Sequence, residues 1–198
     1  EIDLLEIPGS ADKLKAVDPL NDFLVAQQLV FDGQFATALP LISTLRDQKP
    51  HDAVVWLLLG DTYAGLRKLD RAEECFSTAN ALLPVSHLPL HHRGRCRMDL
   101  GQFQLAVEDF DAVLQMRANF PPCLLNRALA QAALGNHAAA VLDYTTALDH
   151  GAPYTRIYFL RARSHESLGN LEAASKDRAK GLSLVPTDEE SWIARGMA

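Results

Sequence analysis

A small residue recurs every 34 residues along most of this 198-residue chain. A second small site, always alanine or glycine, precedes the first one at a constant spacing. Small side chains at fixed intervals let two helices approach closely, because larger ones would overpack the contact. A strict period of this length predicts a repeat array in which each unit packs only on its neighbours. The first site holds Ala38, Ala72, Ala106, Ala140 and Ala174, and the second holds Ala26, Gly60, Gly94, Ala128, Ala162 and Gly196.

Residues that end helices follow the same period. Glycine recurs where the first helix of each unit should stop, which is the usual place of glycine just past a helix C-terminus. Proline closes several of the second helices. The glycines are Gly33, Gly101, Gly135 and Gly169, with Arg67 as the exception; the prolines are Pro50, Pro84 and Pro186, with Ala118 and Ala152 as departures.

The clearest unit is WLLLGDTYAGLRKLDRAEECFSTANALLP, residues 56–84. Its marker residues are Trp56, Leu59, Gly60, Tyr63, Ala72, Phe76, Ala79 and Pro84. At these positions the chain resembles the tetratricopeptide repeat (TPR) family, in arrays of bacterial type. The resemblance implies an all-α fold, a TPR α-solenoid in which antiparallel helix pairs stack as a right-handed superhelix.

The 34-residue frame divides the chain without insertion or deletion. It predicts five TPR units, at residues 19–52, 53–86, 87–120, 121–154 and 155–188. Residues 1–18 precede the pattern and are interpreted as an N-terminal linker or as the remnant of an upstream unit. Residues 189–198 are interpreted as the truncated first helix of a further unit, with Trp192 where Trp56 stands in the second.

Charges enter together at two repeat positions that should face other helices. The first two units hold apolar pairs there, Val25 with Leu41 and Leu59 with Cys75. The next three hold an arginine and an aspartate. An unpaired charge would be unfavourable on such a face, whereas a hydrogen-bonded pair is tolerated, so ion pairs between first and second helices are predicted, within a unit or across to the next. The pairs are Arg93 with Asp109, Arg127 with Asp143, and Arg161 with Asp177.

The resemblance implies that first helices line a concave groove and supply the side chains that face a ligand. In some TPR domains such positions hold the C-terminal carboxylate of a peptide. Here the matching sites carry His91, Arg95, Asn126 and Arg156, with Leu160 where a second cation would sit. Chaperone-tail specificity is therefore not carried over, and a general anion cradle is expected. The candidate peptide-binding residues are His91, Arg95, Asn126, Leu129, Arg156, Phe159 and Arg163.

The stretch HLPLHHRGRCRMD, residues 87–99, concentrates histidine and arginine and raises the question of a metal site. His87 and His91 could share a helix face, but Cys96 falls on another part of the helix. No metal site is predicted. The chain also lacks a nucleophile elbow, a phosphate-binding glycine loop and a supported Cys–His arrangement, so neither enzymatic activity nor a cofactor is predicted.

Composition narrows the class of partner. The net charge of −6 argues against generic binding of nucleic acid, which depends on phosphate neutralisation. No apolar run reaches the roughly 18–20 residues of a membrane helix, and no secretory signal is visible. Three widely spaced cysteines suit a reduced protein better than a disulfide framework, which favours a cytoplasmic location.

These patterns predict a non-catalytic protein–protein interaction scaffold. Its groove would bind an extended or helical peptide, acidic or ending in a free carboxylate. One alternative is an RNA-binding helical repeat that uses Arg95, Arg97 and Arg163 with stacking by Phe159. Another is a structural module of a larger protein, or a homo-oligomer, that stacks end to end through apolar ends near Phe23 and Trp192.

Overall fold

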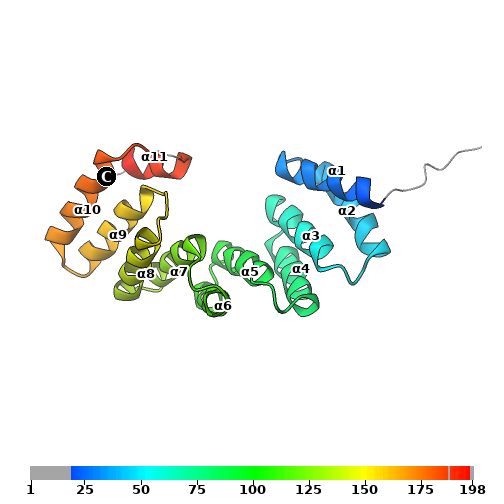
Figure 1. Cartoon of the computed structure of the whole chain (residues 1–198), viewed down its shortest axis with the longest axis horizontal. Helices are drawn as coiled ribbons and strands as arrows, with labels where there is room; N and C mark the ends of the chain where they lie inside the picture. The colour runs from blue at the N-terminus through cyan, green and yellow to red at the C-terminus, as the bar shows by residue number, and fades with distance from the viewer. Residues whose placement is uncertain (1–18, 187, 197–198) are drawn as a thin grey trace, which may run out of the picture.

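The computed structural model describes residues 19–186 and 188–196, which form eleven α-helices and no strand (Figure 1). The predicted N-terminal linker, residues 1–18, lies outside the described residues. None of the described helices is long and apolar enough to cross a membrane. The helices are α1 (Pro19–Phe31), α2 (Phe35–Gln48), α3 (Ala53–Gly65), α4 (Leu69–Leu82), α5 (Leu88–Asp99), α6 (Phe103–Met116), α7 (Pro121–Ala133), α8 (His137–Asp149), α9 (Arg156–Ser167), α10 (Leu171–Ser183) and α11 (Glu189–Gly196).

The helices form an open arc, with α1 and α2 at one tip and α10 and α11 at the other (Figure 1). From α1 to α10 each helix packs on the next one in the chain, whereas α11 packs on α9. Contacts also join α1 to α3, α3 to α5, α5 to α7, and α9 to α11, because these helices line the inner side of the arc. The chain is therefore an α-solenoid, as predicted, and its stability is a sum of contacts between neighbouring helices.

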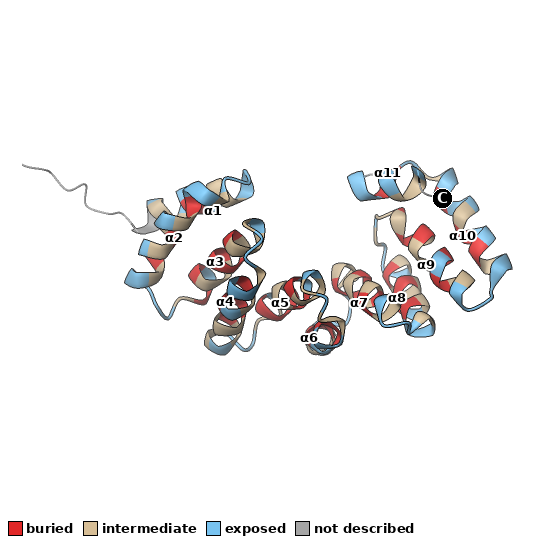
Figure 2. Cartoon of the chain, turned by 180° about the vertical axis from the view of Figure 1, so that it is seen from behind, coloured by how far each residue is buried: buried red, intermediate tan, exposed pale blue. Residues whose placement is uncertain are grey.

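The periodic small residues lie where the helices of a pair cross. All five periodic alanines of the second helices are at most 2 % exposed. A Cβ atom on Gly94 would lie 2.6 Å from Cε1 of Phe110, and one on Gly60 would lie 2.4 Å from Cε1 of Phe76. Both rings are buried, so they cannot move aside freely. The buried faces therefore point between the helices, as Figure 2 shows, and the small residues allow the close approach that seats these rings.

The turns after the first helices use a left-handed backbone. Gly101 has φ of 74° and its N–H donates to the carbonyl of Met98 at 2.9 Å, which satisfies a free carbonyl at the end of α5. Arg67 occupies the equivalent position after α3 with φ of 59°. It is the one non-glycine residue with positive φ in the described part of the chain.

A polar contact sets the start of α3. The Asp52 carboxylate accepts a hydrogen bond from the backbone N–H of Val54 at 2.9 Å, which caps the helix. The indole N–H of Trp56 donates to the carbonyl of Pro50 at 2.8 Å. This bond ties α3 to the loop that follows α2.

Candidate functional site

Three arginines on inner helices each bind an aspartate on the helix that follows. In every pair Nε donates to Oδ2 and Nη2 donates to Oδ1, the two-bond geometry that suits a guanidinium and a carboxylate. The carboxylates are almost fully buried, so each pair keeps two charges satisfied inside the array. The distances are 3.0 and 2.6 Å for Arg93 with Asp109, 2.8 and 2.6 Å for Arg127 with Asp143, and 2.8 and 2.6 Å for Arg161 with Asp177.

The third donor of each guanidinium, Nη1, reaches back to the preceding second helix. It binds Ser77 at 3.2 Å from Arg93, Asp111 at 2.6 Å from Arg127, and Thr145 at 2.9 Å from Arg161. Each arginine therefore joins three helices. The hydrogen bonds to Asp143, and in second place to Asp111, raise the pKa of Arg127 further above its ordinary value.

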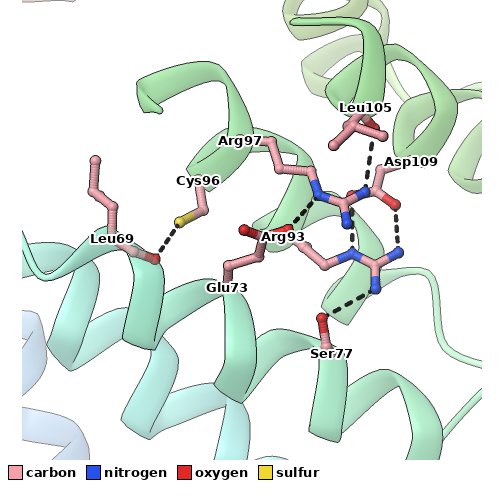
Figure 3. Close-up of polar contacts among 8 residues, drawn as sticks. All are labelled: Leu69, Glu73, Ser77, Arg93, Cys96, Arg97, Leu105 and Asp109. Carbon is pink, nitrogen blue, oxygen red and sulfur yellow. Dashed lines mark hydrogen bonds and ion pairs between the residues drawn. The ribbon is translucent and has the colours of Figure 1, made fainter. Parts of the chain in front are cut away.

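Arg97 belongs to the same buried network, as Figure 3 shows. Its Nε donates to Glu73 at 2.8 Å and its Nη1 donates to Asp109 at 3.0 Å. Cys96 lies one residue before, and its thiol donates to the carbonyl of Leu69 at 3.2 Å. The charge of Arg97 is neutralised inside the array, which removes this residue from the RNA-binding interpretation.

Four of the predicted groove residues line one hollow on the inner side of the arc. His91 and Arg95 come from α5, Asn126 from α7 and Arg156 from α9. The hollow has a volume of about 310 Å³ and is called the polar hollow below. Its other lining residues are Pro122, Leu125, Tyr154 and Glu190.

The polar hollow carries less positive charge than its residue types suggest. Burial lowers the pKa of His91 to about 4, with smaller effects from His92, Arg95 and His87. His91 is therefore neutral near pH 7, and its Nε2 lies 3.2 Å from Nδ2 of Asn126. Because the amide nitrogen of Asn126 can only donate, Nε2 of His91 accepts this hydrogen bond. Arg95 is exposed and has no ion pair among the described residues.

Arg156 already holds two carboxylates, one from the residue just before α11 and one from α11 itself. Its Nη1 lies 2.8 Å from Oε2 of Glu190 and 3.2 Å from Oδ1 of Asp188. Glu190 is 67 % exposed at its side chain, so this ion pair contributes little to stability and can exchange with another carboxylate.

A second hollow adjoins the first and shares Arg156 and Glu190 with it. It has a volume of about 420 Å³ and lies between α9 and α11. Its apolar lining residues are Leu129, Phe159, Leu160, Ile193 and Ala194, and Arg163 and Arg178 also line it. We call it the apolar hollow. It brings the remaining predicted groove residues, Leu129, Phe159 and Arg163, next to the polar hollow.

The regular spacing of these helix pairs agrees with a known repeat family. Family models described as tetratricopeptide repeat match residues 30–87, 92–149 and 125–177. The chain belongs to the tetratricopeptide repeat family.

Solved structures share the TPR architecture over most of the chain. MamA from Desulfovibrio magneticus RS-1 has a TM-score of 0.79 at 15 % identity, covering 85 % of this chain and 96 % of that one. A thermophilic TPR protein from Thermus thermophilus has a TM-score of 0.71 at 22 % identity, covering 90 % and 97 %. YrrB, a TPR protein with an unusual peptide-binding site, has a TM-score of 0.72 at 14 % identity, covering 90 % and 92 %. At such low identities these likenesses show the fold alone. A comparison with curated protein sequences gives no match.

The TPR array places residues in the groove that the sequence interpretation omitted. Glu190, Ile193 and Ala194 come from α11, and Arg178 comes from α10. The repeat period could have identified two of them, since Glu190 and Ile193 lie 34 residues after the predicted groove residues Arg156 and Phe159. The groove therefore continues onto α11.

Two further points of the sequence analysis concern a metal site in residues 87–99 and stacking through the ends of the TPR array. Among the described residues no three His, Cys, Asp or Glu side chains gather as a metal site requires. His87 instead packs edge-on against the ring of Phe120, with centroids 5.3 Å apart. At the ends, Phe23 is partly buried against the core of the first helices, whereas the nearby Phe31 is 84 % exposed and Trp192 is 55 % exposed. End-to-end stacking stays a prediction.

Proposed function

We propose that this TPR array is a non-catalytic protein-interaction scaffold whose concave groove binds an acidic peptide. The peptide would lie extended or helical along the inner helices, with a side-chain or C-terminal carboxylate in the polar hollow. The observation that carries the proposal is that His91, Arg95, Asn126 and Arg156, from three different helices, line one hollow. The similarity in fold to YrrB, a TPR protein with an unusual peptide-binding site, supports a peptide as the class of ligand.

The donors in the polar hollow suit a carboxylate. Arg95 offers an exposed guanidinium, and the amide of Asn126 has a second N–H besides the one that it donates to Nε2 of His91. A charge-assisted hydrogen bond contributes about 1.5–3 kcal/mol. The groove already accommodates a carboxylate, because Glu190 lies 2.8 Å from Arg156. An incoming acidic residue would compete with Glu190 for that arginine.

The test is a titration followed by fluorescence anisotropy. The probes are a labelled glutamate-rich peptide with a free C-terminus, the same peptide amidated, and a lysine-rich peptide of equal length. The glutamate-rich peptide should bind and the lysine-rich one should not. If amidation weakens binding, the hollow holds the terminal carboxylate; if it does not, side-chain carboxylates suffice.

A double variant, Arg95→Ala/Arg156→Ala, should bind the glutamate-rich peptide at least about tenfold more weakly, since it removes two charge-assisted contacts. The control, Lys176→Ala/Lys180→Ala, removes the same charge from exposed positions of α10. Its affinity should stay close to that of the unmodified chain. Equal losses in both variants would show that only net charge matters, and no loss in either would refute the proposal.

A further inference from the structure

An aromatic residue recurs every 34 residues on the second helices and then stops. Phe76 on α4, Phe110 on α6 and Tyr144 on α8 are each at most 1 % exposed. The next residue at this spacing is Arg178 on α10. One period before Phe76 the residue is Ile42 on α2, which is fully buried and apolar, so among the five second helices only α10 carries a charged residue at this site.

The rings fill the space between three helices. Phe76 lies against Gly60 of its own first helix, where a Cβ would come within 2.4 Å of the ring. The same ring lies 5.4 Å from the ring of His92 on the next first helix. Around Arg178, three periods further along the chain, Ala162 stands where Gly60 does and Ala194 where His92 does. Both are small, so neither replaces the missing volume.

Arg178 does not fill the space that a ring would take. Its guanidinium binds the carboxylate of Glu166, with Nη2 3.1 Å from Oε2. Phe159 packs toward α10, where a Cβ on Gly181 would lie 2.7 Å from its ring. The apolar hollow of about 420 Å³ remains, and Arg178 and Ala194 are both among its lining residues.

We propose that the apolar hollow binds one large apolar side chain of the acidic peptide, an aromatic one by preference, in the place of the ring that Arg178 omits. The inference rests on the proposed function and specifies its ligand. The ligand is a peptide with an aromatic residue beside its carboxylates, because the apolar hollow shares Arg156 with the polar hollow and is also lined by Arg163. A cation near an aromatic face adds to such binding.

The first experiment varies the peptide. Three labelled glutamate-rich peptides differ only in one central residue, which is glycine, leucine or phenylalanine. Burial of a large apolar side chain should make the leucine and phenylalanine peptides bind about tenfold or more tightly than the glycine peptide. Equal affinities of the three peptides would overturn the inference.

The second experiment fills the apolar hollow with a larger side chain of the protein itself. Arg178→Phe introduces the phenylalanine that α4 and α6 carry at this site, and Arg178→Ala removes the same arginine and its ion pair without filling the space. The phenylalanine variant should bind all three peptides with the affinity of the glycine peptide, whereas the alanine variant should keep the preference for leucine and phenylalanine. A preference that persists in Arg178→Phe would contradict the inference. Urea unfolding of both variants, followed by circular dichroism, checks that they are folded, and Arg178→Phe should unfold at the same or higher urea.

The two proposals fail in different ways. If the glutamate-rich peptides bind and Arg95→Ala/Arg156→Ala abolishes binding, but the central residue has no effect, only the apolar hollow is misassigned. If no glutamate-rich peptide binds, the proposed function is wrong, and the inference falls with it.

Discussion

Arg161 and Asp177 share two hydrogen bonds, from Nε to Oδ2 at 2.8 Å and from Nη2 to Oδ1 at 2.6 Å. The third donor of Arg161 binds Thr145 at 2.9 Å. The same arrangement recurs for Arg93 and Arg127, so each arginine binds the residues sixteen positions ahead of it and behind it. The side chains of Arg161 and Asp177 are only 17 % and 9 % exposed, so neither charge is stable there without the other.

Asp177→Ala should therefore destabilise the array by about 3 kcal/mol, because it leaves Arg161 buried without its carboxylate. The double variant Arg161→Leu/Asp177→Cys copies Leu59 and Cys75 of the second helix pair and should recover most of the loss. Urea unfolding followed by circular dichroism measures both. A double variant as unstable as Asp177→Ala would show that the lost packing, and not the unpaired charge, is responsible.

Gly94→Ala should destabilise the array by about 1–2 kcal/mol. The added Cβ would lie 2.6 Å from the buried ring of Phe110, and this overpacking outweighs the gain in helix propensity. Gly196→Ala is the matched control, because a Cβ there meets nothing within 4 Å. The midpoint of thermal unfolding should fall for Gly94→Ala alone; an equal or higher midpoint would mean that the Phe110 ring moves aside.

Arg67→Gly should stabilise the array by about 0.5–1 kcal/mol, because Arg67 has a φ of 59° that glycine adopts without strain. The lost contact with Asp99, at 3.5 Å between exposed side chains, contributes little. Gly101→Ala should act in the opposite direction, since its φ is 74°. The two changes in unfolding free energy are compared by urea titration, and the same sign for both would contradict the strain argument.

Acidification should weaken the array through His91. The pKa of His91 is about 4 in the folded chain and about 6.5 in an unfolded chain. Below about pH 6.5 the unfolded chain therefore binds a proton at this residue that the folded chain does not bind, which favours unfolding. The stability lost by about pH 5 is about 2 kcal/mol, and the loss stops growing below about pH 4. His91→Gln cannot titrate and should show a flatter dependence between about pH 7 and about pH 5. If the unfolding free energy of both chains falls equally with pH, a group other than His91 causes the acid sensitivity.

The three thiols should resist alkylation while the chain is folded. Mainly because of burial, the pKa of Cys75 and of Cys96 rises to about 11 and that of Cys123 to about 12. Almost no thiolate is therefore present near neutral pH. Iodoacetamide labelling followed by mass spectrometry should be slow in buffer and rapid in urea. Rapid labelling of one thiol in the folded chain would reveal local opening of its helix.

The period of small residues predicted a repeat array from the sequence alone, because a methyl group or a hydrogen atom at a fixed interval allows neighbouring helices to pack closely. The resemblance to the TPR family then implied the helical solenoid. The matched exchange of Leu59 and Cys75 for Arg93 and Asp109 also made a pair predictable, since a buried charge needs a partner. The backward contacts to Ser77, Asp111 and Thr145 were not predictable, because polar residues at that site have no unique partner until the helices are placed.

The charges and the free volume in the groove were decided only by the tertiary structure. From the sequence His91 is a histidine of ordinary pKa, whereas its burial against neighbouring helices makes it neutral. Arg156 reads as a free cation, but the turn into α11 brings Asp188 and Glu190 to it. The missing ring at Arg178 is visible in the sequence, yet whether a hollow remains there depends on how far Phe159 and α11 close the space. Local chemistry follows from residue type and spacing, whereas charge state and cavity volume depend on what packs around each side chain.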